Sequence, residues 1–256
     1  MIFESHAHYD DEAYNEDRYT LLDSMPENNI GYIINVSASL QTIKSTMDLV
    51  NRYDYVYGAV GVHPSETEEL DDNSMEWIRQ QAEHKKCVAI GEIGLDYHYP
   101  DPEPDIQKKW FERQLFLAKE MNKPVIIHSR EAAKDTMDIL HGEAGQNIRG
   151  VMHCYSYSAE IAKELLKMDY YFGIGGVVTF SNAKKLVEAL DYIPMEKILL
   201  ETDCPYLAPT PHRGERNSSL YIPLIVEKIA QIKNISCEEV ENITQKNAER
   251  LFFNKD

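Results

Sequence analysis

Cysteine is scarce in this chain of 256 residues, and no long hydrophobic run is present. The four cysteines, Cys87, Cys154, Cys204 and Cys237, form no C-x-x-C pair, so a disulfide framework is not expected. Unpaired cysteines are typical of a reducing compartment, and the predicted location is the cytoplasm. No apolar stretch is long enough to span a bilayer, and no basic residue precedes Arg18. The sequence therefore predicts neither a membrane segment nor a secretory signal.

Basic side chains are also few. Lys and Arg number 26 against 43 Asp and Glu, which gives a formal net charge of −17. Binding to a nucleic-acid backbone requires Lys and Arg that displace counterions, so this charge argues against a protein that binds nucleic acid over its whole surface. A small cationic patch around bound metal remains compatible with this charge, because metal ions are often the largest local charges in a site.

Short apolar runs alternate with amphipathic helical segments along the whole chain. Most of these runs are continuous rather than alternating, which is typical of parallel strands covered on both faces. Eight such strands joined by helices favour a single α/β (β/α)8 TIM barrel, with an open doubly wound sheet as the alternative. No G-x-G-x-x-G follows the first strand, which weakens the dinucleotide-binding form of that alternative. The expected strands are Met1–His6, Gly31–Val36, Val56–Gly61, Val88–Gly91, Pro124–His128, Gly150–His153, Tyr170–Ile174 and Ile198–Asp203.

Helical spacing separates these strands. Ile43, Met47 and Val50 follow the i, i+4, i+7 pattern of one buried helix face. Ser236-Cys237-Glu238-Glu239 is a capping-box pattern that predicts a last helix ending near Phe253. No linker rich in Pro, Gly or Ser divides the sequence, and the length fits one barrel. A single domain over residues 1–256 is therefore expected.

Side chains that can bind metal fall at the expected carboxyl ends of the strands. In a barrel these ends meet on one face, where active sites are built. A single His at a strand end is more often a structural residue than a ligand, but the coincidence of six such side chains favours a site. The six residues, from five strands, are His6, His8, Glu92, His128, His153 and Asp203.

His6 and His8 are two residues apart, so their side chains point the same way in an extended chain. Four imidazoles and two carboxylates exceed what one tetrahedral ion needs. The set predicts a pair of divalent ions bridged by a carboxylate such as Glu92, an arrangement that recurs in phosphoester cleavage. Imidazole with carboxylate suits Zn, Mn or Fe, and carboxylate with water suits Mg.

Several neighbouring residues have two interpretations. Cys154 and Cys204 each follow a predicted ligand, and we interpret them as buried apolar cysteines rather than nucleophiles. Glu201 should share the inward direction of Asp203, either as a partner of the site or as a buried acid paired with a cation. Tyr97 and Tyr99, in the loop after Glu92, are candidates for facing the substrate.

These motifs together resemble the TatD family of metal-dependent deoxyribonucleases, within the amidohydrolase-type barrels. The resemblance runs from end to end of the chain and is specific in combination, although H-x-H alone would be weak. The matching segments are His6-Ala7-His8, Gly61-Val62-His63-Pro64, Gly91–Tyr97 (GEIGLDY), Pro124–Ala132 (PVIIHSREA), Leu200–Leu207 (LETDCPYL) and Asn247–Phe252 (NAERLF), with 173–180 and 182–185 also similar.

The resemblance implies a role for each candidate. One ion would be held by His6, His8, Glu92 and Asp203, and the second by Glu92, His128 and His153. His63 resembles the family's active-site histidine near the substrate phosphate, and Arg130 and Arg213 resemble its basic residues around the mouth. With Asp203 and Glu92, His63 completes the expected catalytic set.

Two segments depart from the family's pattern. Tyr9 stands where the family usually has an aliphatic residue, which suggests a change in packing. Asn217-Ser218-Ser219 replaces the family's common Asn-Glu-Pro, so neither serine receives a substrate role.

The predicted activity is hydrolysis of DNA phosphodiesters by a water that two metal ions (Mg, Mn or Zn) activate. Asp203 would orient this water and take its proton. The few basic groups predict a short footprint, hence action at ends or on single strands. The resemblance to the family implies a DNA exonuclease, for which we expect 3′–5′ polarity. No obligate protein partner is evident.

Two alternatives stay open. The same metal pair could cleave an ester or amide, as in a D-aminoacyl-tRNA deacylase, because several functions share this fold. Alternatively, the metal could be structural or vestigial in a protein that is not an enzyme.

Overall fold

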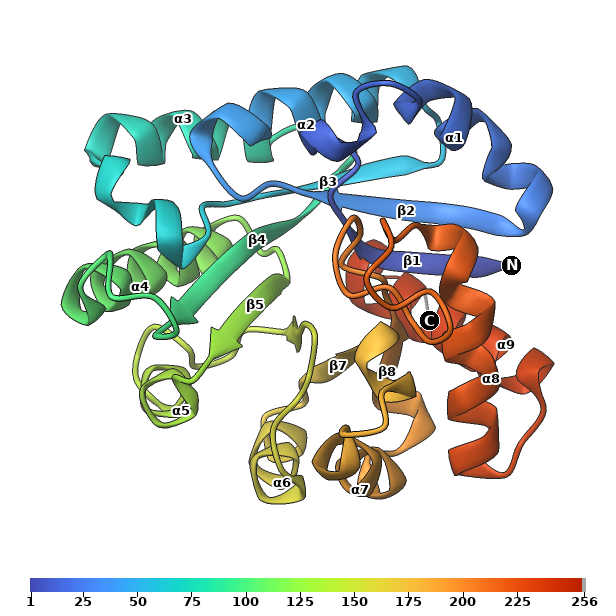
Figure 1. The fold of residues 1–256 in the computed structure, drawn as a ribbon. Coiled ribbons are helices and arrows are strands. Elements are labelled where there is room, and N and C mark those ends of the chain that lie inside the picture. The colour runs from blue at the N-terminus through green and yellow to red at the C-terminus, as the bar shows by residue number, and fades with distance from the viewer. Residues whose placement is uncertain (255–256) are drawn as a thin grey trace. The chain divides into compact units, whose positions relative to one another are not determined.

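The computed structural model describes residues 1–254, in which eight strands alternate with helices (Figure 1). The strands are β1 (Ile2–Ala7), β2 (Ile30–Val36), β3 (Val56–Val60), β4 (Cys87–Asp96), β5 (Val125–Arg130), β6 (Gly150–Met152), β7 (Tyr171–Ile174) and β8 (Ile198–Leu200). The α-helices are α1 (Arg18–Ser24), α2 (Leu40–Arg52), α3 (Asp72–Ala82), α4 (Pro104–Glu120), α5 (Ala133–His141), α6 (Ala159–Lys167), α7 (Lys184–Tyr192), α8 (Ile222–Lys233) and α9 (Cys237–Phe253).

The strands form one sheet in the sequential order β1 to β8, with a helical connection after each. Ala7, at the end of β1, makes a parallel bridge to Cys204, in the segment that follows β8, so the last strand returns beside the first. This order is that of a (β/α)8 barrel, and the predicted fold class is confirmed. The alternative of an open doubly wound sheet is wrong, because such a sheet does not bring its first and last strands together.

Residue contacts divide the chain into two compact units. The first unit comprises Met1–Asn35 and the segment from His153 onward, and the second comprises Val36–Met152. The single domain expected from the sequence therefore stays a prediction.

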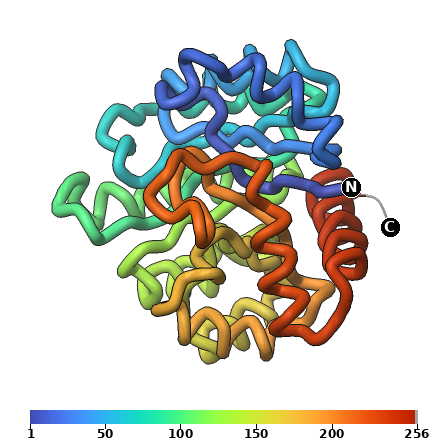
Figure 2. The backbone as a smooth tube through the Cα atoms, turned by 45° about the vertical axis from the view of Figure 1, so that its right-hand side comes forward, coloured from blue at the N-terminus to red at the C-terminus, as the bar shows by residue number. Residues whose placement is uncertain are grey.

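In the first unit, the last helix packs against the first strand. Helix α9 runs beside β1, as Figure 2 shows, and the ring of Phe3 lies 6.1 Å from that of Phe252 and 5.5 Å from that of Phe253. The predicted end of this helix at Phe253 is confirmed. Phe3 is fully buried, so the aromatic contact fixes the chain that leads directly into His6 and His8.

The predicted capping box at the start of α9 is also confirmed. Ser236 Oγ accepts a hydrogen bond from the Glu239 backbone N–H at 3.2 Å, and the Ser236 N–H donates to Glu239 Oε2 at 2.9 Å. We expect Ser236→Ala to lower the free energy of unfolding by about 1 kcal/mol, measured by urea denaturation. Ser158 precedes α6 without a capping hydrogen bond, so Ser158→Ala should cost clearly less. Equal losses in the two variants would contradict the capping role of Ser236.

In the second unit, β4 is central and pairs in parallel with β3 and β5, and α4 packs against it (Figure 1). The prediction that this strand ends at Gly91, with Glu92 closing it, is wrong, because β4 continues to Asp96. The pairing of Gly94 with His128 sustains the longer strand. A Cβ on Gly94 would lie 1.9 Å from the carbonyl oxygen of His128, so only glycine permits this close approach.

The expected ends of two other strands also need correction. Strand β8 ends at Leu200, so Asp203 lies in the loop beyond it, in a left-handed conformation with φ 56°. His153 likewise follows β6 rather than closing it, because that strand ends at Met152. The apolar run of β8 stops at Leu200 and is followed by the polar residues Glu201, Thr202 and Asp203. The carboxylate of Asp203 is presented by an irregular turn beyond the strand.

Candidate metal centre

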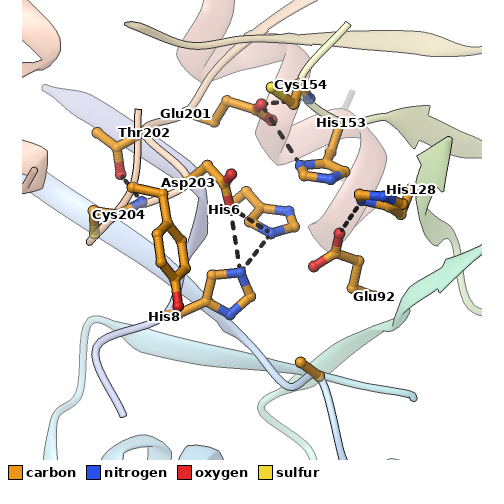
Figure 3. Close-up of polar contacts among 12 residues, drawn as sticks. His6, His8, Glu92, His128, His153, Cys154, Glu201, Thr202, Asp203 and Cys204 are labelled. Atoms are coloured by element: carbon orange, nitrogen blue, oxygen red, sulfur yellow. Dashed lines mark hydrogen bonds and ion pairs between the residues drawn. The ribbon is translucent and has the colours of Figure 1, made fainter. Parts of the chain in front are cut away.

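His6, His8 and Asp203 form the first cluster, in the first unit (Figure 3). The Nε2 atoms of the two histidines lie 3.1 Å apart, and Asp203 Oδ1 lies 3.6 Å from His6 Nε2 and 3.4 Å from His8 Nε2. The spacing of two along an extended strand explains why both rings face the same point, as the sequence predicts. These three residues could hold one metal ion.

Backbone hydrogen bonds fix the position of this first cluster. The Asp203 N–H donates to the His6 carbonyl at 3.0 Å, and the His8 N–H donates to the Cys204 carbonyl at 2.9 Å. Burial alone would raise the pKa of Asp203, but the hydrogen bond with His8 and the neighbouring imidazoles hold it below its ordinary value. Asp203 is therefore an ionised carboxylate at neutral pH, able to bind a cation or accept a proton.

Glu4 organises the backbone beneath the first cluster, although the sequence pattern did not reveal it. Its buried carboxylate accepts hydrogen bonds from the His6 N–H at 3.1 Å and from the Thr202 N–H at 3.0 Å and hydroxyl at 2.7 Å. Ser219 Oγ donates to the same carboxylate at 2.9 Å. Burial raises the pKa of Glu4 to about 7. Glu4 thus ties the segment carrying His6 to the segment carrying Asp203.

His153 lies in the first unit beside His6, with the two rings stacked at 4.0 Å between centroids. His153 Nδ1 is 3.8 Å from Glu201 Oε1, and the Cys154 N–H donates to the same oxygen at 2.6 Å (Figure 3). Burial raises the pKa of Glu201 to about 8. Of the two interpretations of Glu201, these contacts favour a partner of the site, since the side chain that it meets is His153, a predicted metal ligand.

The second cluster, in the second unit, consists of His63, Glu92 and His128. His128 Nδ1 lies 2.8 Å from Glu92 Oε1, and His63 Nε2 lies 3.8 Å from the same oxygen. The rings of His63 and His128 meet edge to face at 4.3 Å. His63 precedes the short 3-10 helix Pro64–Glu69, and its Nδ1 accepts the Ser65 N–H at 3.2 Å. That contact leaves Nε2 to face Glu92.

The donor atoms of both clusters fit a divalent ion. Each cluster offers two imidazole nitrogens and one carboxylate oxygen, all within 4.8 Å of one another. Such mixed nitrogen and oxygen ligands suit Zn, Mn or Fe. Glu92 is 3% exposed, and a carboxylate removed from water in this way requires a cation or donors around it.

Asp96 is a second residue of the site that the sequence reasoning missed. It closes β4, is 5% exposed, and its Oδ2 lies 3.0 Å from His128 Nε2. Burial tends to raise the pKa of Asp96, but hydrogen bonds with His128 and the His98 N–H hold it below its ordinary value. An acid at the end of a strand whose neighbour carries His128 is the signal that could have identified it.

Comparisons with known proteins identify the family of this chain. A family model described as TatD related DNase matches residues 3–253. The chain is 42% identical over 252 residues to the uncharacterized metal-dependent hydrolase YabD of Bacillus subtilis, covering 98% of this chain and 99% of the relative. The chain belongs to the TatD family. It is accordingly a metal-dependent hydrolase, and the resemblance seen in its motifs is confirmed.

Solved structures of TatD proteins share the fold. The crystal structure of YjjV, a TatD homologue from Escherichia coli, superimposes with a TM-score of 0.92 at 28% identity, covering 98% of each chain. A TatD family hydrolase from Entamoeba histolytica gives a TM-score of 0.90 at 24% identity, covering 99% of this chain and 98% of that one, a likeness of fold alone. The barrel is thus the architecture of the TatD family along the full chain.

The two basic residues implied by the TatD resemblance are exposed and lie over aromatic rings. The Arg130 guanidinium is 5.7 Å from the ring of Tyr99, and that of Arg213 is 4.3 Å from the ring of Phe180. Tyr97 instead donates from its hydroxyl to Asp135 at 2.8 Å. Tyr99 is 56% exposed and remains a candidate for contact with substrate, whereas Tyr97 is engaged with α5.

The two cysteines next to predicted ligands differ from each other. Cys204 is fully buried, and burial raises the pKa of its thiol to about 12, as expected of an apolar packing residue. Cys154 is partly exposed, so its interpretation as a buried cysteine is wrong. Its backbone adopts φ 43°, which turns its N–H toward Glu201.

The two departures from the TatD pattern lie in contact with each other. Tyr9 is fully buried, its hydroxyl donates to Ser219 Oγ at 2.8 Å, and the Ser219 N–H donates back to the Tyr9 hydroxyl at 2.9 Å. Because Ser219 also donates to Glu4, the pair belongs to the network beneath the first cluster. The departure at Tyr9 therefore affects hydrogen bonding as well as packing.

We expect Tyr9→Phe to lower the free energy of unfolding by about 1–3 kcal/mol, because the Ser219 N–H would remain buried without its acceptor. Combining it with Ser219→Ala in a double-mutant cycle, measured by urea denaturation, should give a coupling of about 1 kcal/mol. Tyr206 is exposed and donates to Asp11, so Tyr206→Phe should change stability by less than about 0.5 kcal/mol. Strict additivity of the Tyr9 and Ser219 variants would contradict the coupling.

Proposed function

We propose that this chain hydrolyses phosphodiester bonds of DNA, as a 3′–5′ exonuclease acting on single-stranded ends. The observation that carries the proposal is the first cluster, in which an ionised carboxylate and two imidazoles face one point. The description of the matching family as DNases supports the choice of DNA as substrate. The acidic net charge of −17 favours a short contact with nucleic acid over an extended one.

We further propose that each cluster binds one divalent ion, Mg, Mn or Zn. The ligands would be His6, His8 and Asp203 in the first cluster and Glu92 and His128 in the second. The sequence prediction also gives His153 as a ligand of the second ion and Glu92 as the bridging carboxylate. Bound divalent ions would lower the pKa of water and stabilise negative charge on the phosphoryl group. The mixed ligands of the described clusters support this assignment.

The chain's own residues would perform the remaining steps. Asp203 would orient the attacking water and accept its proton, because its lowered pKa keeps it ionised at neutral pH. His63 would donate from Nε2 to a phosphate oxygen of the substrate. Arg130 and Arg213 would bind neighbouring phosphates, and Tyr99 would offer an exposed ring for stacking on a base.

The test is a cleavage assay on a single-stranded oligonucleotide labelled at either end, after reloading the metal-free protein with Mg, Mn or Zn. Stepwise shortening from the 3′ end that depends on metal is the expected result. Shortening from the 5′ end would overturn the polarity alone. Absence of cleavage with every metal, together with turnover of an aminoacyl ester on tRNA, would replace the DNase proposal by the ester hydrolase.

We also propose a cytoplasmic location. The four cysteines are free thiols, which is typical of a reducing compartment. Within residues 1–254, no helix combines the length and the apolar character needed to cross a bilayer.

A further inference from the structure

His128 lies between two carboxylates of the same strand, β4. Its Nδ1 is 2.8 Å from Glu92 Oε1, and its Nε2 is 3.0 Å from Asp96 Oδ2. A neutral imidazole carries a proton on one nitrogen only and offers a lone pair on the other. The carboxylate that accepts the imidazole proton therefore determines which nitrogen of His128 is available to bind a cation.

The carboxylate of Asp96 is held rigidly in its position. Its Oδ1 accepts the His98 N–H at 2.9 Å, which leaves Oδ2 directed at His128. Gln107, buried on α4, holds the backbone on both sides of the residue. Its Oε1 accepts the Asp96 N–H at 2.8 Å, and its Nε2 donates to the Asp96 carbonyl at 2.9 Å and to the Pro102 carbonyl at 2.7 Å.

The surroundings of the Glu92 carboxylate differ from those of Asp96. Its Oε1 faces two imidazoles, His128 at 2.8 Å and His63 at 3.8 Å, and these three residues are the ones close enough to share an ion. If Nε2 of His128 keeps its proton on Asp96, then Nδ1 and Glu92 Oε1 are two lone-pair donors facing the same point. Such a pair is stable when a cation lies between them.

We infer that Asp96 is a positioning residue, which holds the Nε2–H of His128 and so directs Nδ1, beside Glu92, toward the ion of the second cluster. The arrangement is a carboxylate–histidine–metal relay, in which the outer carboxylate fixes the ring and raises the basicity of the nitrogen that binds. The inference rests on the proposed metal site of the second cluster and extends it to a residue outside that cluster.

The test measures Zn²⁺ binding by calorimetry in an Asp203→Asn background, which removes the carboxylate of the first cluster and leaves the second intact. Asp96→Asn keeps the size of the side chain but removes the charge and one of its two acceptor oxygens. We expect it to weaken Zn²⁺ binding by about 10–100-fold. The matched control is Glu131→Gln, since Glu131 Oε1 likewise meets a histidine nitrogen, His98 Nδ1, at 2.8 Å, but on the exposed surface. It should leave Zn²⁺ affinity unchanged.

Nuclear magnetic resonance of the ¹⁵N-histidine-labelled, Zn²⁺-loaded protein gives a second readout. The wild type alone shows which nitrogen of His128 binds the ion, and comparison with Asp96→Asn shows whether Asp96 holds the proton on the other nitrogen. We expect Zn²⁺ on Nδ1 of His128, with a slowly exchanging proton on Nε2 that the Asp96→Asn variant loses. A structural role for Asp96 alone would leave the coordinating nitrogen and this proton unaffected.

The outcomes separate the inference from the proposal beneath it. Zn²⁺ binding within twofold of the background value in Asp96→Asn, or Zn²⁺ on Nε2 of His128 in the wild type, would overturn the positioning role and leave the second metal site standing. Failure of the Asp203→Asn background to bind any Zn²⁺, although Asp96 is intact, would overturn the metal site and the inference with it.

Discussion

Asp203→Asn is expected to reduce the rate of DNA cleavage by about a thousandfold or more, with the fold unchanged. The substitution keeps the shape of the side chain, and Asn tolerates the left-handed backbone with φ 56°. It removes the negative charge that sits 3.4–3.6 Å from two imidazoles. Loss of a proton acceptor alone costs about 10²–10⁴-fold in rate, and the first cluster would also lose its anionic ligand.

The measurement is the initial rate on an end-labelled single strand at saturating metal, with circular dichroism to verify folding. Asp169→Asn is the matched control, because Asp169 also has a left-handed backbone, with φ 64°, but forms an ion pair with Lys197 on the surface. It should retain the wild-type rate. Wild-type turnover by Asp203→Asn would remove Asp203 from the mechanism and leave the two clusters as binding sites only.

The fold and most candidate ligands could be predicted because each depends on local patterns. Continuous apolar runs identify the strands of a parallel sheet, and the capping box marks the start of α9 within one residue. The i, i+2 spacing of His6 and His8 is enough to place both rings on one face. Membership of the family then followed from motifs that surround these residues.

The residues that the sequence did not reveal act through long-range contacts. Glu4 meets donors about two hundred positions away, at Thr202 and Ser219, which no local pattern connects to it. Asp96 was not identified because the expected fourth strand stopped at Gly91, five residues before it. The strand continues through Gly94, where the carbonyl of His128 leaves no room for a Cβ.

Glu201 is another buried acid, and its partner also could not be predicted from the sequence. Its direction along the chain is evident from the spacing to Asp203, but its partner is not. Gly173 on β7 makes room for it, since a Cβ there would lie 1.9 Å from Glu201 Oε2. The acid therefore reaches His153 and the Cys154 N–H across a gap that exists only because a neighbouring strand carries glycine.

Removal of metal is expected to lower the melting temperature by roughly 10–20 °C relative to the protein saturated with Zn²⁺ or Mn²⁺. An ion present at a hundred times its Kd stabilises the folded state by about 2.7 kcal/mol. For a chain of this size, 1 kcal/mol corresponds to about 2–4 °C, so two ions account for the expected shift. The physical source is the attraction between a bound cation and the buried side chains that face it, such as those of His6 and Glu92.

The clusters should contribute separately to this stabilisation. Differential scanning calorimetry of Glu92→Gln, with and without metal, should show roughly half of the wild-type shift, because the second cluster loses its carboxylate while the first keeps Asp203. Glu120→Gln is the control, since Glu120 pairs with Arg79 at the surface, and it should show the full shift. Identical melting temperatures for the metal-free and metal-saturated wild-type protein, with no bound metal detected by elemental analysis, would refute both metal sites. A full shift retained by Glu92→Gln would instead assign all of the stabilisation to the first cluster.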